Sequence, residues 1–337
     1  MSTLSLNTQI AFHSEITVKE GLYDEVLKDR ASSLWFYDEA LPDLWIKKLV
    51  AHVPKERCFA LPAKEKAKTF ETFQTLVTLC DALKPTRHTT VVALGGGALC
   101  DTVAFFASTY LRGLPLVLVP TTLLAMVDAS IGGKTALNTS YKNRIGTFYP
   151  ASKVCVDPNF LTTLTPQLKA EGYSEIIKIA AVFDRDFFAG LEAKTLSETN
   201  IIERAIHLKC VCVEKDLSDQ GQRMLLNFGH TYGHALESLH QYQIPHGICV
   251  AAGMVLMTQN QPHVGQRIKT VLKQYDAYQP IPFERDALIE ALYGDKKRSN
   301  QSLTVVRLHT LGHGTLESLP IETFILEIPQ HFKEDAL

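Results

Sequence analysis

The chain has 337 residues, of which 46% are hydrophobic, and its 34 basic and 36 acidic side chains give a formal net charge of −2. These values are typical of a globular protein and exclude a disordered, collagen-like or coiled-coil chain. At about 150 residues per domain, the length predicts two domains. The near-neutral charge argues against a nucleic acid or a membrane surface as a partner.

The cysteines and the first residues indicate where the protein acts. The seven cysteines form no CxxC pair, which predicts free thiols in a reducing compartment. The segment MSTLSLNTQIAFHSE has no basic stretch followed by an apolar one, so we expect no signal peptide. The longest apolar run, 114–127, is too short for a membrane-spanning helix, which needs about 20 apolar residues. We therefore expect a cytoplasmic protein.

The first half of the chain alternates between strand-like and helix-like patterns. Helices are expected at 64–83 and from the glycines at 95–97 to Leu111. Strands are expected at 33–37, 57–62, 89–94, 115–119 and 154–156. Such alternation predicts parallel β/α units, with ligands at the carboxyl ends of the strands.

The second half is mainly helical. Thr165 and Pro166 are typical of a helix start, as N-cap and first-turn proline. Helices are expected at about 165–182, 185–197, 199–215, 221–241, 247–260 and 284–293, and one strand at 303–308. We therefore expect an α/β domain over residues 1–160 and a mainly helical domain over 161–337, with the cleft between them as the default site.

Three glycines, Gly95, Gly96 and Gly97, stand between an expected strand and an expected helix. They let the backbone approach a phosphate closely, and a helix N-terminus offers free N–H groups and a positive dipole end. The pattern is not GxGxxG, and a glycine-rich turn by itself is more often only a turn. Asp101 is equally explained as a carboxylate near a helix N-terminus.

The segment PTTLLAMVDASIGGKT, 120–135, follows another expected strand. Thr121 and Thr122 stand where hydroxyls can reach a cofactor. The ending GGKT is similar to the end of a P-loop, but Asp128 stands where that motif needs its first glycine, which excludes an ATPase of this type. Lys134 still suits an anionic group.

Histidines concentrate between residues 230 and 246. His230 and His234 are four residues apart and lie on one face of an expected helix. The pair lacks the glutamate of HExxH and is not a zincin motif. A catalytic zinc takes three protein ligands and an open position, so His246 and a distant carboxylate are further candidates. The pattern is equally consistent with ordinary surface or core histidines that bind no metal.

Basic residues flank these segments. Each by itself is most simply a solvated surface charge. They are Arg112, Lys142, Lys178, Lys209, Arg223, Lys296 and Lys297.

Taken together, the segments resemble the 3-dehydroquinate synthases of the sugar phosphate cyclase family, from about residue 34 to about 310. The motifs are GGGALCDTVAFFASTYLRG, PTTLLAMVDASIGGKTALN, KNRIGTFY, FLTTLTP, EGYSEIIK, GQRMLLNFGHTYGHALE and PHGICVAAGM. The resemblance implies a Rossmann-like NAD-binding α/β domain, a helical domain that carries the metal, and a homodimer. It also implies the conversion of 3-deoxy-arabino-heptulosonate 7-phosphate to 3-dehydroquinate and phosphate, in the shikimate pathway to aromatic amino acids, by a carbon–oxygen lyase.

The resemblance implies three sets of site residues. The metal ligands would be Glu175, His230 and His246, and two imidazoles with a carboxylate suit zinc or cobalt. NAD contacts would come from Asp38, Glu65, Lys68, Gly96, Gly97, Asp101, Thr121, Thr122, Asp128, Lys134, Lys142, Phe160, Leu161, Thr162 and Thr163. Substrate and catalytic contacts would come from Arg112, Lys134, Asn143, Lys178, Lys209, Arg223, Asn227, His234 and Lys296.

Some roles are implied as well. Arg223 and Lys209 would hold the substrate carboxylate, because a guanidinium binds carboxylates bidentately. His234 would shuttle a proton, since imidazole titrates near neutral pH. The phosphate holders would be Lys134, Asn143, Asn227 and Arg112, with Arg112 coming from the same or the partner subunit. Although the chain as a whole is neutral, these cations predict an electropositive cleft.

The chain departs from the family pattern at several positions. Cys100 and Ala104 replace usual glycines, and Cys100 would add a side chain near the pyrophosphate path. Lys64 also replaces a glycine, and the loop 138–142 is one residue short and lacks a proline and a glycine. Asp219 replaces a glutamate. Ile248 replaces another glutamate, which would remove a partner of the metal ligands.

Three alternatives remain open at this point. The first is a sister cyclase that acts on another sugar phosphate, of the inosose or valiolone synthase type. The second is a metal-dependent polyol dehydrogenase, in which NAD would be a stoichiometric co-substrate. The third is a non-catalytic NAD-binding protein, which only the changes at Cys100 and Ile248 support.

Overall fold

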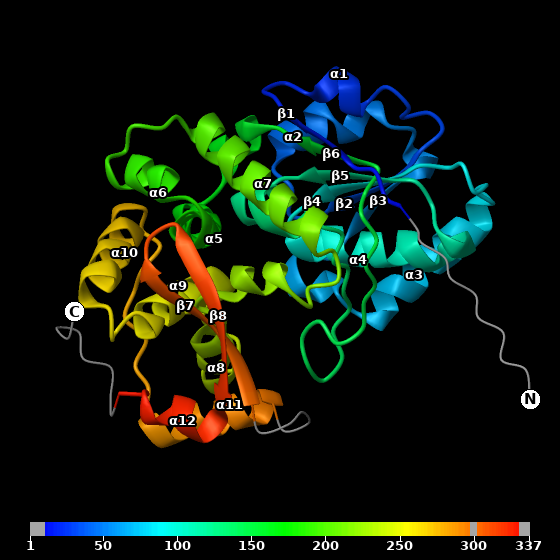
Figure 1. Ribbon diagram of the computed structural model, residues 1–337. Coiled ribbons are helices and arrows are strands. Elements are labelled where there is room, and N and C mark those ends of the chain that lie inside the picture. The colour runs from blue at the N-terminus through cyan, green and yellow to red at the C-terminus, as the bar shows by residue number, and fades with distance from the viewer. Residues whose placement is uncertain (1–10, 297–301, 330–337) are drawn as a thin grey trace, which may run out of the picture. The chain divides into compact units, whose positions relative to one another are not determined.

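The computed structural model describes residues 11–296 and 302–329 (Figure 1). The chain divides into two compact units. The first unit comprises the chain up to Val119 and Gly133–Val156, and the second comprises Pro120–Gly132 and the chain from Asp157 onward. The expected division at residue 160 therefore differs for the segment 120–132, which groups with the helical part of the chain.

The first unit is built on a six-stranded sheet with the strand order β1-β6-β5-β4-β2-β3. Its strands are β1 (Glu15–Val18), β2 (Leu34–Asp38), β3 (Cys58–Leu61), β4 (Val91–Gly95), β5 (Leu116–Pro120) and β6 (Lys153–Val156). The pairs β1–β6, β5–β6, β2–β4 and β2–β3 run parallel. The expected α/β domain with a parallel sheet is thus confirmed, and β1 is a strand that the sequence pattern missed.

The helices of the first unit follow its strands. They are α1 (Tyr23–Val26), α2 (Asp43–Lys48), α3 (Phe70–Leu83) and α4 (Gly97–Thr109). The helix expected at 64–83 begins instead as a 3₁₀ turn at Lys64–Ala67, and α3 starts only after Thr69. The Thr69 hydroxyl accepts a hydrogen bond from the N–H of Thr72, which is a favourable N-cap.

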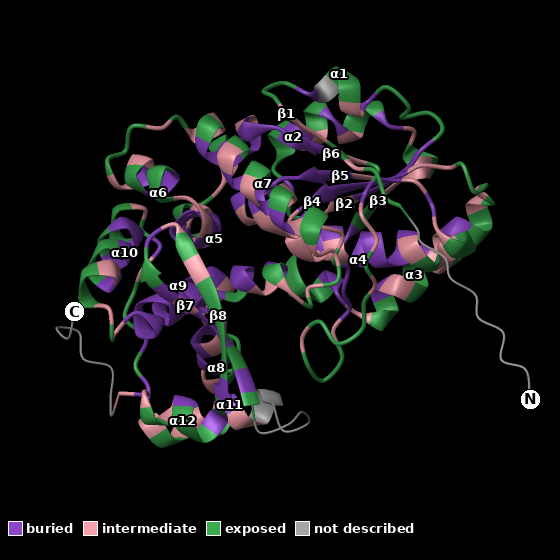
Figure 2. Cartoon of the chain, in the orientation of Figure 1, coloured by how far each residue is buried: buried purple, intermediate pink, exposed green. Residues whose placement is uncertain are grey.

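The second unit is mainly helical. Its elements are α5 (Pro166–Phe183), α6 (Arg185–Glu192), α7 (Glu198–Lys215), α8 (His230–Leu239), α9 (His246–Met257), α10 (Pro262–Gln274), α11 (Arg285–Lys296), α12 (Ile321–Leu326), β7 (Ser302–Thr310) and β8 (His313–Pro320). Helix α9 is buried along almost its whole length and packs against α5 and α8 (Figure 2). The strand expected at 303–308 is β7, which pairs antiparallel with β8.

One long expected helix, 221–241, is broken. Gln222–Asn227 form a 3₁₀ helix, and α8 starts at His230 after Gly229, whose φ is +80°. A Cβ at Gly229 would lie 2.7 Å from the carbonyl oxygen of Val250, so the break lets α8 approach α9 closely. Helices α10 and α12 and strand β8 were not expected from the sequence.

All seven cysteines are free thiols, and five of them are buried. Among the described residues, no helix is both long and apolar enough to cross a membrane.

Candidate functional site

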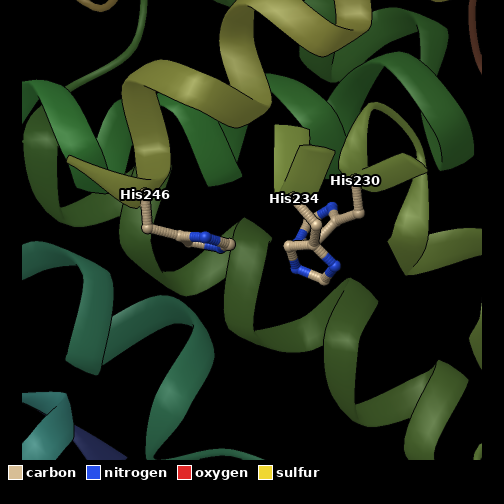
Figure 3. A group of neighbouring side chains, drawn as sticks. All are labelled: His230, His234 and His246. Carbon is tan, nitrogen blue, oxygen red and sulfur yellow. The ribbon is translucent and has the colours of Figure 1, made fainter. Parts of the chain in front are cut away.

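Four predicted side chains meet in the second unit, where three helices present them. Glu175 comes from the middle of α5, whereas His230 and His246 are the first residues of α8 and α9. The ligand atoms of His230, His234 and His246 all lie within 4.8 Å of one another. Figure 3 shows the ring of His246 extending toward the other two rings.

The two predicted histidine ligands have the same arrangement. The Nε2 atoms of His230 and His246 lie 3.8 and 3.6 Å from Oε1 of Glu175. Each Nδ1 faces an oxygen on its other side, at 3.3 Å from the carbonyl of Phe228 for His230 and at 3.1 Å from Oε2 of Glu237 for His246. Because a carbonyl or a carboxylate only accepts, both Nδ1 atoms carry a proton, and in the neutral form of each ring Nε2 is left as a lone-pair donor.

Glu175 is a carboxylate without enough partners. Its side chain is 1% exposed, and its Oε1 accepts no hydrogen bond from any described residue. Its other oxygen, Oε2, forms an ion pair with Lys178, one turn further along α5. An ionised carboxylate buried in this way is costly unless a cation compensates it. Two imidazole nitrogens and this oxygen are a donor set that fits Zn²⁺ or Co²⁺.

The electrostatic surroundings shift the pKa values of the two histidines in opposite directions. Burial and the nearby ammonium of Lys178 lower the pKa of His230 well below its usual value. Burial also acts to lower the pKa of His246, but the carboxylates of Glu237 and Glu175 outweigh it and raise this pKa. His230 is therefore neutral near pH 7, as a metal ligand must be.

Three predicted substrate-binding cations, Lys178, Lys209 and Arg223, are buried in this unit. The Nζ atom of Lys209 lies 2.5 Å from both the carbonyl and the carboxylate of Asp128. Burial acts to raise the pKa of Asp128, but Lys209 and Lys178 lower it below its usual range. Asp128 belongs to a single π-helical turn, Ala125–Ala129, a geometry frequent at functional sites.

The backbone around Arg223 is shaped to hold its guanidinium. Its Nη1 donates to the carbonyls of Gly132 and Leu217, at 3.1 and 2.8 Å. Gly132 has φ +92°, and a Cβ there would lie 2.6 Å from Nη2 of Arg223. A residue missed by the sequence reasoning, Asp216, accepts hydrogen bonds from the N–H groups of Gly221 and Arg223 and fixes the turn before the arginine. Its signal was an acidic residue at the end of an expected helix, which favours a turn.

The other predicted residues of this unit differ in burial and in their hydrogen bonds. Thr121 is buried, and the hydroxyl of Thr122 accepts from the N–H of Ala125. Thr162 and Thr163 donate their hydroxyls to carbonyls of their own 3₁₀ helix, in which Phe160 and Leu161 are buried. Asn227 is exposed at the end of a 3₁₀ helix, and His234 is exposed on α8. Lys296 ends α11, and its side chain lies outside the described part of the structure.

In the first unit, the predicted NAD residues cluster at the carboxyl ends of β2 and β4. Asp38 ends β2, and a Cβ at Gly95 would lie 3.1 Å from its Cβ. Helix α4 starts directly afterwards, with Gly96 as N-cap and Gly97 as its first residue. The glycines thus leave the backbone and the N–H groups of α4 accessible to a phosphate.

Lys68 connects two predicted groups of the first unit. Its side chain is buried, and its Nζ donates to Asp101 at 2.6 Å and to Asn143 at 2.5 Å. The short loop is tied to the same place, because Asn138 accepts from the N–H of Asn143 and donates to Glu65. Predicted cofactor and substrate residues therefore share one network.

The remaining predicted residues of this unit are more exposed. Lys134 is exposed, and its backbone bridges to that of Phe148. Lys142 is half-buried next to Asn143. Arg112 stands on an exposed turn with φ +66°.

Three of the departures from the family pattern, at Cys100, Lys64 and Ile248, have local explanations. Cys100 is 1% exposed, and its thiol faces the carbonyl of Gly95 at 3.7 Å, so it packs inside the unit. Lys64 adopts φ +57°, the left-handed conformation that a glycine takes without strain. Ile248 is buried, but His246 still has a carboxylate partner, because Glu237 supplies it from α8. The sequence reasoning missed Glu237, whose signal was an acidic residue inside an apolar helix.

Two adjoining family descriptions match most of the chain. Residues 58–171 match "3-dehydroquinate synthase N-terminal", and residues 172–298 match "3-dehydroquinate synthase C-terminal". A 3-dehydroquinate synthase of Methylacidiphilum infernorum (isolate V4) is 37% identical over 324 residues, which cover 91% of this chain and 86% of that protein.

Solved structures of other cyclases have the same fold. The 2-epi-5-epi-valiolone synthase of Streptomyces hygroscopicus subsp. jinggangensis 5008, with NAD⁺ and Zn²⁺ bound, has a TM-score of 0.83 at 28% identity and covers 96% of this chain and 98% of its own. A 2-deoxy-scyllo-inosose synthase, complexed with carbaglucose-6-phosphate, NAD⁺ and Co²⁺, has a TM-score of 0.80 at 25% identity, with 93% and 95% covered.

Proposed function

Because this chain belongs to the 3-dehydroquinate synthase family, we propose that it converts 3-deoxy-arabino-heptulosonate 7-phosphate to 3-dehydroquinate and phosphate. The observation that carries the proposal is the meeting of Glu175, His230 and His246 beside the buried cations of the same unit. The relatives bear the name of this activity, and the related cyclases contain NAD⁺ with Zn²⁺ or Co²⁺.

The residues present fit both cofactors. Glu175, His230 and His246 would hold the metal, and the end of β4 with the N-terminus of α4 would receive NAD. When bound, NAD supplies a reversible oxidation of a substrate hydroxyl, and the metal supplies Lewis-acid polarisation of that oxygen.

The chain's own side chains bind and orient the substrate. Arg223 and Lys209 would hold its carboxylate, since both cations are buried and fixed by neighbouring carbonyls and by Asp128. Burial of these cations strengthens their attraction for an anion. His234 would move the proton, because it is the exposed histidine of the cluster. Lys134, Asn143, Asn227 and Arg112 would hold the phosphate, with Lys178 and Lys296 as further contacts.

The direct test is to incubate the purified protein with the heptulosonate phosphate, catalytic NAD⁺ and Zn²⁺. We expect stoichiometric release of phosphate and 3-dehydroquinate, with no net NADH. The absence of both products would refute the proposal.

The same assay separates the alternatives. Faster turnover of a sugar phosphate without a carboxylate, such as glucose 6-phosphate, would identify a sister cyclase. Steady accumulation of NADH with glycerol would identify a polyol dehydrogenase. The buried Arg223 and Lys209 favour an acidic substrate over both.

We further propose a homodimer in which Arg112 acts in the site of the partner subunit. The exposure of Arg112 on a turn supports this role. Mixed dimers of an Arg112→Ala subunit and a His230→Ala subunit would then contain one intact site and regain activity. If neither variant complements the other, Arg112 acts in its own subunit or not at all.

A further inference from the structure

The carboxylate of Glu237 is buried, which is unfavourable for an ionised group. Its side chain is 4% exposed on α8, and an ionised group at such burial needs compensation by charge or hydrogen bonds. Its Oε2 lies 3.1 Å from Nδ1 of His246, which begins the neighbouring helix α9. This ion pair links α8 and α9 through a predicted metal ligand.

The contact determines which nitrogen of His246 faces Glu175. A carboxylate accepts the Nδ1–H, so the ring is held in the tautomer whose Nε2 lone pair is free. That Nε2 lies 3.6 Å from Oε1 of Glu175. For His230 the corresponding partner is a neutral backbone carbonyl, that of Phe228. The two histidines thus share one orientation, but only His246 has an ionised partner.

We propose that Glu237 is a positioning residue that fixes the tautomer and orientation of His246 for metal binding. The inference rests on the proposed function only for the identity of the metal site. A negative partner makes an imidazole a stronger donor, and such partners change metal affinity by about 10- to 100-fold. Glu237 itself would not touch the metal, because its oxygen lies on the Nδ1 side of the ring.

The test compares three variants. Glu237→Ala removes the acceptor, Glu237→Gln keeps an uncharged acceptor of the same shape, and Glu203→Ala, on an exposed position of α7, is the matched control. We expect Glu237→Ala to weaken Zn²⁺ affinity by about 10- to 100-fold in competition with a chromophoric chelator, and Glu237→Gln by less. The control should bind like the wild type. Equal affinities for wild type and Glu237→Ala would overturn the proposal.

A second measurement needs neither metal nor activity. In ¹⁵N-histidine-labelled metal-free protein, two-bond ¹H–¹⁵N correlations report the tautomer of each ring. At a pH at which the ring is neutral, we expect His246 to be the Nδ1–H tautomer in the wild type and in Glu237→Gln, and to shift toward Nε2–H in Glu237→Ala. An unchanged tautomer in Glu237→Ala would overturn the proposal. If Glu237→Ala does not fold, the comparison of Glu237→Gln with the wild type decides, since loss of the charge alone should still weaken Zn²⁺ binding.

These readouts separate the two proposals. Failure to form 3-dehydroquinate, together with weakened Zn²⁺ binding and an altered tautomer, refutes the proposed function and supports the role of Glu237. Formation of 3-dehydroquinate by the wild type, together with unchanged Zn²⁺ affinity and an unchanged His246 tautomer in Glu237→Ala, supports the proposed function and refutes the role of Glu237.

Discussion

Lys68 in the first unit and Glu175 in the second differ in how their buried charges are compensated. In the first unit, the buried ammonium of Lys68 donates to both Asp101 and Asn143. In the second unit, Oε2 of the buried Glu175 carboxylate pairs with Lys178, whereas Oε1 accepts no hydrogen bond from the described residues and faces two histidines. The first arrangement stabilises the unit itself, whereas the second is prepared for a ligand. Substitutions should therefore cost mainly stability in the first unit and mainly binding in the second.

The largest effect is expected for His230→Ala. Loss of one of the three proposed ligands should lower metal affinity by more than about 100-fold and abolish activity, because even indirect partners contribute about 10- to 100-fold. Added Zn²⁺ should raise the melting temperature of the wild type but not of this variant, since only a bound ligand stabilises the fold. His207→Ala, on an exposed position of α7, is the control. Retained Zn²⁺ binding in His230→Ala would contradict the proposal that the second unit holds the metal through His230.

Arg223→Lys tests the substrate side of the second unit. A lysine cannot reproduce the guanidinium fork, and hydrogen bonds to charged groups contribute about 1.5–3 kcal/mol, so kcat/KM should fall by about 10- to 100-fold, mainly through KM. The control is Arg267→Lys, because Arg267 forms a more exposed ion pair with Glu192. A purely structural arginine would instead lower the melting temperature with KM unchanged.

Lys68→Met tests the satisfied network of the first unit. The substitution removes the ammonium from Asp101 and Asn143, and the loss of a partner of buried polar groups costs about 1–3 kcal/mol. We expect a lower midpoint of urea unfolding even without NAD. Lys153→Met, which breaks an exposed ion pair with Glu25, should cost less than about 1 kcal/mol. Unaltered unfolding combined with weakened NAD binding would assign Lys68 to ligand binding alone.

Lys64→Gly should act in the stabilising direction. Lys64 holds a left-handed conformation at φ +57°, which costs a residue with a Cβ about 1–2 kcal/mol. Glycine removes this strain but has more freedom in the unfolded chain, so the net gain should be at most about 1 kcal/mol. Thermal unfolding measures it, and Lys66→Gly, in the same 3₁₀ turn without positive φ, should be destabilising. A loss of stability in Lys64→Gly would show that its side chain has a further role.

The smallest effect on the cofactor is expected for Cys100→Ala. The thiol is buried against the carbonyl of Gly95, and burial raises its pKa, so it stays protonated and away from solvent. We expect NAD affinity to change by less than about 2-fold, while stability falls by roughly 1 kcal/mol for the small cavity. Titration calorimetry with NAD⁺ decides. A large change in affinity would place Cys100 at the pyrophosphate after all.

Local patterns predicted much of the fold. Hydrophobic alternation predicted the strands whose carboxyl ends carry the predicted NAD residues. Capping predicted the helix start at Thr165 and Pro166. The placement of His230 and His234 on one helix face follows from the 3.6-residue period, and the structure confirms it. The break before α8 was missed, because it depends on the approach of Val250 to Gly229, which is distant in sequence.

The sequence by itself determined the alternating first half and the helical second half, and its family motifs predicted the metal and substrate residues. Only the tertiary structure decided which of these groups are satisfied by neighbours. Lys68 finds partners 33 and 75 residues away, and His246 finds Glu237 on another helix, although Ile248 stands where a carboxylate was expected. The physical reason is that propensities and periodicity act over a few residues, whereas burial and hydrogen bonding of a polar side chain depend on the elements that pack around it.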